Sequence, residues 1–347
     1  MPDQAPFPIL LEPILKEKVW GGDRLREFEK QVAHGDRIGE SWELADLDST
    51  SASGGGGGEA VSKIRGGPLD GQTLRDAIEL WGDELIHSKR LLQGRFPLLV
   101  KYLDAREHLS VQVHPSPEYA GEHPEARLKT ECWFVLRADP LDDGSKPVIY
   151  KGVKEGIDAD EFRRRVELAA RTGKEPVDEA DSVPAALQDI PAKPGDMHLL
   201  PSGTVHALGA GVLVAEIQTP SDTTFRVYDW AKEYGREGRD LHIEESMACI
   251  DFGPAPESTS LGKGMTRGVL CDTEHFSVER VVLNPDQTIE FKGGRCLVVM
   301  VLDGGIELDG HIHYVGATLV IPRAWSGKAR CENLARLLVV TVGNPKD

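Results

Sequence analysis

The chain has 347 residues, of which 40% are apolar and 6% aromatic, and it carries 57 acidic against 40 basic side chains, a formal net charge of -17. This length allows two domains or one large domain with a substantial core. The negative charge argues against binding to nucleic acid or to an anionic membrane surface, because both need a positive field. Every apolar run is shorter than the roughly 18 residues that span a bilayer, so we expect a cytoplasmic protein.

Short β-rich segments bounded by Gly, Pro or Asp dominate the chain, a pattern typical of a sandwich or barrel. In chain order they cover residues 96–105, 109–115, 132–138, 211–219, 296–305 and 334–342. Two patches with helical periodicity interrupt them, at 73–89 and within 158–190. In the second patch Phe162, Val166 and Ala169 fall on one face. This patch predicts a small helical insertion between β segments.

Two compositional features indicate no site of their own. The five cysteines lack C-x-x-C spacing, so neither a disulfide framework nor a zinc–thiolate site is expected, and we predict reduced, partly buried thiols. The segment 49–60 contains five successive glycines and is predicted to be a flexible surface loop. A phosphate-cradling role for this loop is not supported, because no Lys-Ser/Thr pair follows in P-loop spacing.

A faint internal repeat relates two segments of the chain. Residues 195–206, GDMHLLPSGTVH, and residues 316–327, GATLVIPRAWSG, both read Gly, five residues, Pro and then a turn. Five positions past the proline, the first copy has His206 and the second has Gly327. Each copy predicts a turn that feeds a strand ending at proline. The repeat therefore predicts two related β-barrels, of which only the first keeps a polar residue at this position.

Polar residues with metal-ligand character gather around the first copy. Gln112 and His114 are two residues apart, so on a strand their side chains emerge on one face. Glu131 comes from the next β segment, and His206 follows the PSGT turn. Two imidazoles, a carboxylate and an amide oxygen suit Zn²⁺, with Mn²⁺, Fe²⁺ or Co²⁺ as alternatives. Taken alone, the Gln-x-His pair would be interpreted as an ordinary polar strand face.

The same segments carry a resemblance to a known family. Residues 195–206 match the second cupin motif, and Gln112 and His114 followed by Glu131 match the first, with Gln in place of the usual leading His. The trailing Asn of the motif is absent, since Ala210 stands there. Over about two-thirds of its length the chain resembles the bacterial type I mannose-6-phosphate isomerases, most specifically in PSGTVHAL and SDTTFRVYDW. The last hundred or so residues resemble only a degenerate cupin.

This resemblance implies a mainly β fold of two cupin-type jelly-roll barrels with a small helical insertion. The catalytic domain is expected over residues 1–157 and 191–252, and the insertion over 158–190. A degenerate cupin domain without a metal site is expected over 253–347. We expect a monomer or a weak dimer that acts on a small sugar phosphate, with neither nucleic acid nor membrane as a partner.

The resemblance also implies a function, a zinc-dependent aldose–ketose isomerase that interconverts mannose 6-phosphate and fructose 6-phosphate with one Zn²⁺ per chain. The zinc ligands that it implies are Gln112, His114, Glu131 and His206, the set that spacing also indicates. Arg226 and Lys129 match active-site residues of the family, and Ser110 matches a residue near the phosphate. Without the family, Arg226 would be a surface ion-pair partner, Lys129 a solvated charge and Ser110 a strand hydroxyl.

The chemistry of isomerisation explains why such residues gather. A proton moves between adjacent carbons through an enediol-like intermediate, so negative charge develops on the sugar oxygens. Zinc and Arg226 are expected to stabilise that charge. Three candidates remain for the base that carries the proton: Lys129, a water on the metal and a carboxylate such as Glu40. The dianionic phosphate needs local cations, for which Arg226, Lys129 and Lys232 are the candidates.

Several other aromatic and histidine residues invite a functional interpretation. Trp20 is expected to line the pocket, whereas Trp42, on an alternating strand, is predicted to be core. His242 is predicted to pack against or cap nearby structure. The HIH run at 311–313 has metal-like spacing, but it lies in the second barrel, where Gly327 replaces the histidine that would complete a site.

Two other functions are weighed against the isomerase. A catalytically silent cupin that binds a sugar phosphate or metal as a sensor or partner protein is the main alternative. The complete ligand set with Arg226 argues against it. An iron-dependent cupin oxygenase is disfavoured because Gln112 occupies a ligand position.

Overall fold

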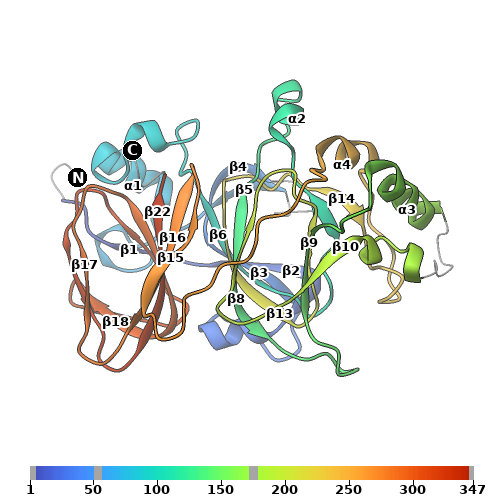
Figure 1. Cartoon of the computed structure of the whole chain (residues 1–347). Coiled ribbons are helices and arrows are strands. Elements are labelled where there is room, and N and C mark those ends of the chain that lie inside the picture. The colour runs from blue at the N-terminus through green and yellow to red at the C-terminus, as the bar shows by residue number, and fades with distance from the viewer. Residues whose placement is uncertain (1–4, 51–56, 172–178, 344–347) are drawn as a thin grey trace.

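The structure is a computed structural model that describes residues 5–50, 57–171 and 179–343 (Figure 1). The polyglycine loop prediction falls largely on residues 51–56, outside the described residues, as do residues 172–178 of the predicted helical insertion. All five cysteines are free and buried, which is more complete burial than the sequence predicted. In the described residues no helix is long and apolar enough to cross a membrane.

Two antiparallel sheets face each other and form the N-terminal part of the molecule, which we call the first unit. The six-stranded sheet has the order β11 (Met197–Leu200), β8 (Glu131–Ala138), β13 (Val212–Gln218), β6 (Leu99–Asp104), β3 (Ile38–Leu44) and β2 (Ile14–Gly22). The five-stranded sheet has the order β10 (Leu187–Pro191), β9 (Val148–Val153), β12 (His206–Leu208), β7 (Val111–Val113) and β14 (Phe225–Tyr228). A separate hairpin joins β4 (Asp46–Thr50) to β5 (Gly58–Val61).

A third, nine-stranded sheet forms the C-terminal unit, drawn in orange and red in Figure 1. Its main path is β1 (Ile9–Leu10), β20 (Thr318–Ile321), β18 (Leu297–Leu308), β22 (Ala335–Val342), β16 (Phe276–Leu283) and β15 (Arg267–Asp272). Three further strands branch from it, β17 (Thr288–Phe291), β19 (His311–Tyr314) and β21 (Gly327–Arg330). The N-terminal strand β1 pairs with β20, so the start of the chain completes the C-terminal sheet.

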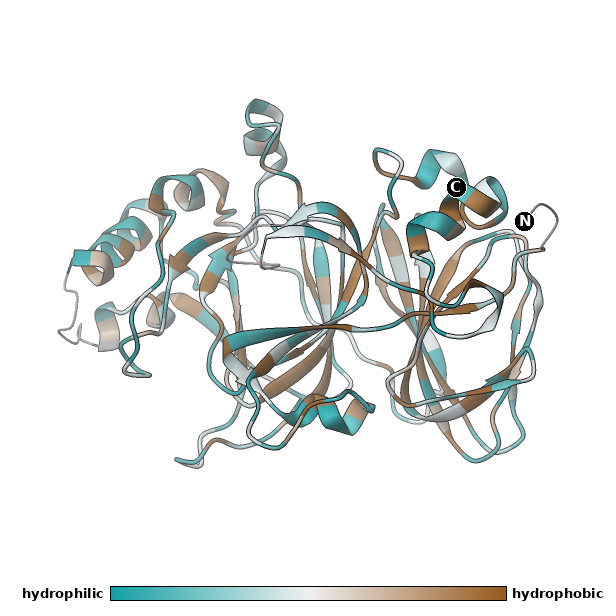
Figure 2. Cartoon of the chain, turned by 180° about the vertical axis from the view of Figure 1, so that it is seen from behind, coloured by the Kyte–Doolittle hydropathy of each residue, from teal (hydrophilic) through white to brown (hydrophobic). Residues whose placement is uncertain are grey.

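The two faces of the six-stranded sheet contribute side chains to two different hydrophobic cores, because side chains alternate along each strand. On β8, Trp133 and Val135 are buried in a cluster with Ile149 of the five-stranded sheet. The intervening Phe134 is buried in another cluster that includes Phe276 of the C-terminal sheet. Because successive strand residues point to opposite faces, the six-stranded sheet is the middle layer of the molecule. Figure 2 shows the hydrophobic residues concentrated along the strands of both units.

The helices lie at the periphery and differ in part from the sequence prediction. They are α1 (Leu74–Trp81), α2 (Pro117–Glu122), α3 (Ala159–Arg171) and α4 (Ile243–Cys249). The helix predicted over 73–89 is wrong beyond Trp81, because Gly82 takes a left-handed φ of 48° and 3-10 turns follow. On α3 the predicted face is buried as expected. The pattern within 158–190 is helical only in part, since it runs into strand β10.

The internal repeat predicted from sequence is present in the backbone. Gly195 and Gly316 both adopt positive φ values, 97° and 84°, in the turns that precede β11 and β20. Pro201 and Pro322 follow these two strands directly. After the next turn a new strand begins at His206 in the first copy, and at Gly327 in the second. The mainly β prediction is therefore confirmed, together with the turn–strand–proline device in each unit.

Candidate active site

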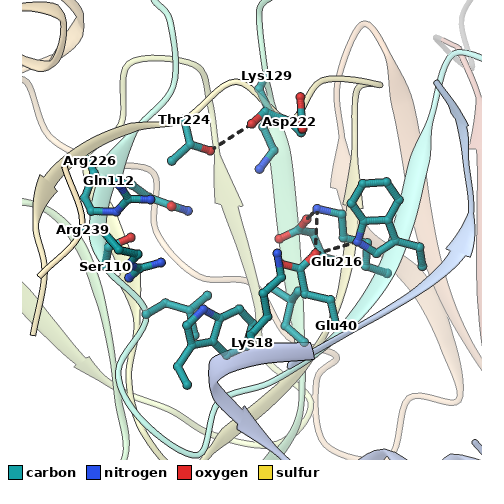
Figure 3. A pocket seen from close by; sticks show the side chains of 15 residues that line it. Lys18, Glu40, Ser110, Gln112, Lys129, Glu216, Asp222, Thr224, Arg226 and Arg239 are labelled. Atoms are coloured by element: carbon teal, nitrogen blue, oxygen red, sulfur yellow. Dashed lines mark hydrogen bonds and ion pairs between the residues drawn. The ribbon is translucent and has the colours of Figure 1, made fainter. Parts of the chain in front are cut away.

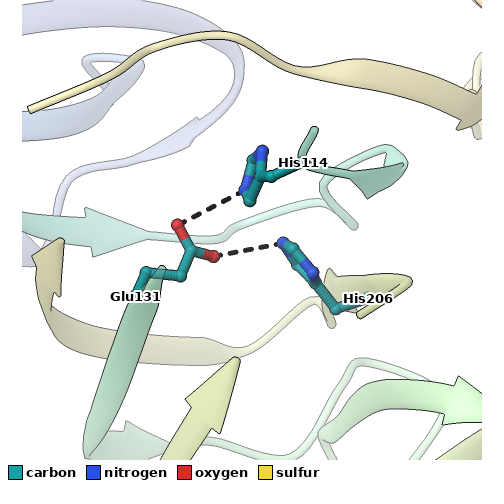
Figure 4. A group of neighbouring side chains, drawn as sticks. All are labelled: His114, Glu131 and His206. Atoms are coloured by element: carbon teal, nitrogen blue, oxygen red, sulfur yellow. Dashed lines mark ion pairs between the residues drawn. The ribbon is translucent and has the colours of Figure 1, made fainter. Parts of the chain in front are cut away.

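Three buried side chains form the one group in the described residues that could hold a metal ion, His114, Glu131 and His206. They come from three strand ends, the residue after β7, the start of β8 and the start of β12. The Nε2 atom of His114 lies 3.4 Å from Oε2 of Glu131, and that of His206 lies 3.1 Å from Oε1. Figure 4 shows both rings turned toward the carboxylate. All the donor atoms lie within 4.8 Å of one another.

The backbone holds both imidazoles in the form that a metal requires. Nδ1 of His114 is 2.9 Å from the carbonyl oxygen of Thr223, and Nδ1 of His206 is 2.8 Å from that of Thr204. A carbonyl can only accept, so each Nδ1 carries the proton and each Nε2 keeps its lone pair. Nε2 of His114 and both oxygens of Glu131 are buried without a hydrogen bond in the described residues, and the carboxylate has only ion-pair contacts with His114, His206 and Lys129. A cation between them would satisfy these acceptors.

Gln112 lies directly beside this group. It pairs with His206 across β7 and β12, and its Nε2 atom is 3.2 Å from Nε2 of His206. A half-turn of the amide would present Oε1 instead, because the two ends of a glutamine amide are nearly the same shape. Two imidazoles, a carboxylate and an amide oxygen form a donor set that suits zinc.

Lys129 is the cation nearest to the group. Its Nζ atom lies 2.6 Å from Oε2 of Glu131, and both side chains are buried. Burial alone would raise the pKa of Glu131, but Lys129 and His114 lower it below its ordinary value. Burial, assisted by Lys129, lowers the pKa of His114 to about 3. The carboxylate is thus ionised and the imidazole neutral, as metal ligation requires.

A pocket opens beside the group and collects most of the predicted site residues (Figure 3). Its lining includes Trp20, Glu40, Ser110, Gln112, Lys129 and Arg226, all predicted from sequence. Lys232 is not among them, because its Nζ donates a hydrogen bond to the carbonyl oxygen of Ala169 on α3. Trp42 is fully buried, as predicted for core, and its ring edge also reaches the pocket.

Arg226 stands on one wall of the pocket with Gln112, Ser110 and Arg239 (Figure 3). Its Nη1 donates to the carbonyl oxygen of Asp240 at 2.7 Å, while its buried Nε has no hydrogen bond in the described residues. Burial and the nearby Arg239 lower the pKa of Arg226 to about 10. The guanidinium therefore remains charged at neutral pH and has donor capacity left for a ligand.

His242 supports this wall, in agreement with the prediction that it packs or caps. It precedes α4, and its Nδ1 accepts the backbone N–H of Arg226 at 3.1 Å. The HIH run lies elsewhere, on β19 of the C-terminal unit, where His311 is exposed and contacts the carbonyl oxygen of Asp309.

The opposite wall carries a buried charge network that sequence reasoning missed. Nζ of Lys101 lies 3.3 Å from Glu216 and 3.7 Å from Glu40. Lys18 pairs with Glu40 at 3.2 Å, and Trp42 Nε1 donates to the same carboxylate at 2.6 Å. Burial would lower the pKa of Lys101, but these carboxylates raise it, and Lys101 with Lys18 lowers the pKa of Glu40 to about 2.

Other lining residues were also missed, namely Lys18, Asp222, Thr224 and Arg239. The sequence did contain a signal for two of the network residues. Lys101 interrupts the apolar run LLVKYL, and Glu216 interrupts the apolar run VLVAEI. Charged residues are rarely buried unless they are paired, so two such interruptions predict an ion pair across the sheet.

Comparison with known proteins shows a family resemblance over most of the chain. A family model described as the catalytic domain of type I phosphomannose isomerase matches residues 9–134. A Bacillus subtilis protein named probable mannose-6-phosphate isomerase GmuF is 37% identical over 284 residues, which cover 78% of each chain. Another, mannose-6-phosphate isomerase ManA, is 32% identical over 96% of this chain and 98% of its own.

Solved structures agree with the sequence relatives. The crystal structure of the Bacillus subtilis mannose 6-phosphate isomerase superposes with a TM-score of 0.73 at 29% identity, covering 96% of this chain and 99% of that one. A zinc-bound mannose 6-phosphate isomerase superposes with a TM-score of 0.72 at 17% identity, over 97% of this chain and 99% of its own. The second match concerns the fold alone, which is the cupin-type fold that the sequence predicted.

Proposed function

The chain belongs to the type I mannose-6-phosphate isomerase family, and from this premise we propose that it interconverts mannose 6-phosphate and fructose 6-phosphate. The observation that carries the proposal is the buried His114–Glu131–His206 group beside a pocket lined by arginine and lysine. Such a pocket suits a phosphorylated, oxygen-rich substrate in a chain whose net charge is otherwise negative.

One Zn²⁺ per chain is the cofactor that we propose. Its ligands are Gln112, His114, Glu131 and His206. The proton-free Nε2 atoms and the buried carboxylate oxygens without hydrogen bonds support this fit, and a zinc-bound isomerase shares the fold. When bound, zinc supplies a Lewis acid that stabilises the charge developing on the sugar oxygens.

The cationic wall has two tasks in this proposal. Arg226 stabilises the negative charge of an enediol-like intermediate, because its guanidinium is fixed by the Asp240 carbonyl and needs no rearrangement during the reaction. The phosphate lies toward Ser110, a buried hydroxyl on the same wall, with Trp20 covering the sugar. Lys129 lies beside the proposed metal ligand Glu131, at the top of the pocket as drawn in Figure 3.

Lys129 and Glu40 are the two predicted residues that could carry the proton between the sugar carbons. The pKa of Glu40 is about 2, so its carboxylate is a weak base for a carbon acid at neutral pH. We therefore propose an electrostatic role for Glu40 and propose Lys129 as the base, a role that requires Lys129 first to give up the proton that it holds beside Glu131. Exchange of the substrate C2 hydrogen with deuterated solvent should be lost in Lys129→Met and retained in Glu40→Gln. The reverse pattern would assign the base to Glu40.

The catalytic unit in this proposal consists of residues 1–157 and 191–252, with the insertion at 158–190 and the C-terminal unit at 253–347. Sheet pairing supports this division except at β1, which adds to the C-terminal sheet, and at β10, which lies mostly within 158–190 but pairs with β9 of the five-stranded sheet. A silent cupin that binds sugar phosphate or metal without turnover is the competing function. If the protein catalysed no reaction, Arg226 and the buried Lys101 network would have no catalytic role.

The deciding experiment is a coupled assay of the purified protein on mannose 6-phosphate, before chelation, after chelation and after zinc is restored. His206→Ala is tested beside the wild type. We expect turnover that chelation abolishes, that zinc restores and that the variant lacks. Zinc binding without any conversion would support the silent cupin instead, and activity indifferent to chelation would reject the proposed ligand set.

A further inference from the structure

A second pocket, of about 660 Å³, opens on the outer face of the five-stranded sheet. On β9, Ile149 packs between the two sheets with Trp133, whose ring also contacts that of His206. The next residue, Tyr150, packs instead against the cluster that contains Phe162 of α3. Successive strand residues point to opposite faces, so this pocket lies on the far side of the sheet from the proposed metal ligands. In the described residues it shares no lining residue with the active-site pocket.

Four aromatic rings that line this pocket contact one another. His108 stacks on Trp230, with ring centroids 4.3 Å apart and planes 25° apart. The ring of Tyr150 lies 5.6 Å from that of Trp230, and the ring of Tyr228 lies 5.3 Å from it at an angle of 82°. Trp230 is buried, whereas the other three residues are only half-buried. We call the space lined by these four residues the aromatic pocket.

Hydrogen bonds hold two of the four rings in place. Nε1 of Trp230 donates to the carbonyl oxygen of Leu109 at 2.7 Å. Nδ1 of His108 accepts the backbone N–H of Ala210 at 3.1 Å, and the backbone N–H of His108 donates to the hydroxyl of Tyr234 at 2.9 Å. Burial lowers the pKa of His108 to about 4, so its ring is neutral at pH 7. The aromatic pocket therefore presents fixed, uncharged rings, which lose little freedom when a ligand binds.

The charged side chains around the aromatic pocket balance one another. They are two lysines and two carboxylates, Lys146, Lys154, Asp189 and Glu233. Lys154 pairs with Asp189 at 3.5 Å, and Glu233 accepts a hydrogen bond from the hydroxyl of Tyr228. The lining residues thus carry no net charge, and one lysine is already paired, so the pocket offers little to a phosphate group. A carboxylate accepts several hydrogen bonds, so Asp189 and Glu233 keep acceptor capacity for hydroxyl groups.

Aromatic rings beside carboxylate acceptors fit a sugar that carries no phosphate. The C–H bonds on one face of a pyranose ring pack against the negative face of an aromatic ring, while its hydroxyl groups donate to carboxylates. The aromatic pocket combines the two features, with Tyr150 and His108 as ring surfaces and Asp189 and Glu233 as acceptors. We propose that the aromatic pocket binds the ring of an unphosphorylated pyranose, at a site separate from the one that takes the sugar phosphate.

Methyl mannopyranoside and methyl glucopyranoside are suitable probes. Their blocked anomeric carbon does not open to an aldehyde, so an aldose–ketose isomerase cannot convert them. Saturation-transfer NMR with the full-length protein detects contact with the sugar protons, and we expect at least one probe to bind in the millimolar range. Tyr150→Ala should weaken this binding by at least about fivefold. Tyr150→Phe keeps the ring and should weaken it by less than about threefold.

A second variant tests the acceptors without disturbing the core. The side chain of Asp189 is 58% exposed, so Asp189→Asn should fold normally. It should weaken glycoside binding by about threefold, because a neutral amide is a poorer acceptor than a carboxylate. Conversion of mannose 6-phosphate should be equal in the wild type, Tyr150→Phe and Asp189→Asn. Failure to bind a glycoside is therefore a separate result from failure to isomerise.

Two further variants show which site the glycoside occupies. Tyr314→Ala removes a 62% exposed ring from the C-terminal unit and should leave glycoside binding unchanged, as should Arg226→Gln in the active site. Loss of binding in Arg226→Gln would place the glycoside in the active site and overturn the proposal. Absence of binding by both probes, or binding indifferent to Tyr150→Ala, would also overturn it. Adenosine bound in place of the glycosides, and lost in Tyr150→Ala, would assign the pocket to a nucleobase instead.

Discussion

The two β units of this chain share a backbone device but fill their interiors differently. In the first unit a row across the six-stranded sheet brings His198, Trp133, Glu216, Lys101 and Trp42 into register. The C-terminal unit instead encloses aliphatic and aromatic side chains such as Phe291, Val301 and Leu337. The same turn–strand–proline segment therefore supports either a charged, chemically active interior or an inert one. Function depends on which side chains stand at the strand ends.

The difference between the two interiors is clearest at the position five residues past Pro201 and Pro322. His206 contributes an imidazole that is fixed by Thr204 and buried beside Glu131. At the equivalent Gly327, a Cβ would lie 2.4 Å from the ring of Trp325. The C-terminal copy thus lacks both the ligand and the space for it, so loss of the site there involves the whole neighbourhood.

Exchanging these two residues should have the largest effect, and it tests whether they account for the difference between the two units. His206→Gly removes a proposed zinc ligand and should lower kcat/KM by roughly 10³-fold or more, together with loss of bound zinc. Gly327→His should create no second zinc site, because its neighbours in the C-terminal interior are apolar. Zinc content by mass spectrometry and the coupled assay measure both effects.

The reciprocal variant supplies the control. Gly327→His should retain one zinc and near-normal activity, while the free energy of unfolding falls by about 1–3 kcal/mol as Trp325 is displaced. Two zinc ions per chain in this variant would mean that the C-terminal unit is a latent metal site rather than an inert one.

Lys101→Met tests whether the charged interior of the first unit is a paired network. The substitution leaves the buried carboxylates of Glu216 and Glu40 without their shared cation. Breaking a buried pair in this way destabilises by about 3–5 kcal/mol. Activity should fall as well, since Lys101 lines the pocket. Urea unfolding and steady-state kinetics measure the two losses.

Leu337→Ala in the C-terminal core is the matched comparison. Leu337 is fully buried among apolar side chains, so truncation should cost about 2–5 kcal/mol of stability. Activity at 25 °C should be kept, because the side chain is remote from the metal group. If both variants lose stability and activity in the same proportion, the charged network has no role of its own.

Local patterns in the sequence predicted more of the site than its composition could. The Gln-x-His pair and the histidine after the PSGT turn are local features, and the structure brings both beside Glu131. The Lys101–Glu216 pair was missed because it depends on the register of two strands more than a hundred residues apart. Lys232 was expected near the phosphate because the phosphate needs cations, but its side chain turns to α3.

The fold, like the site, could be predicted from sequence only where it depends on local patterns. Short apolar runs and the Gly-to-Pro repeat predicted the strands and the two related units, since each depends on neighbours in sequence. The pairing of β1 with β20 joins residues about three hundred positions apart and leaves no local signal. The helix predicted over 73–89 stops at Gly82, where conformational freedom outweighs the apolar periodicity that continues beyond it.

His198 offers the smallest and most specific test of the polar interior. It is fully buried, and neither ring nitrogen has a hydrogen bond in the described residues. Burial, assisted by Lys151, lowers its pKa to about 4 from 6.5. Between these values the unfolded chain binds a proton that the folded chain does not, so stability falls as the pH drops from 6.5 toward 4. At pH 5 this amounts to about 1–2 kcal/mol.

His198→Leu should remove that loss. The decrease in unfolding free energy between pH 7 and pH 5, measured with urea, should be about 1–2 kcal/mol smaller in the variant than in the wild type. His34→Leu, which changes a histidine whose side chain is 90% exposed, should keep the wild-type decrease. Acid sensitivity of this kind is not confined to the first unit, since burial also lowers the pKa of His313 on β19 to about 4, so His198→Leu removes only the part that belongs to His198. An unchanged pH dependence in His198→Leu would mean that the imidazole is solvated in the folded protein, and that the first unit is wetter inside than its packing indicates.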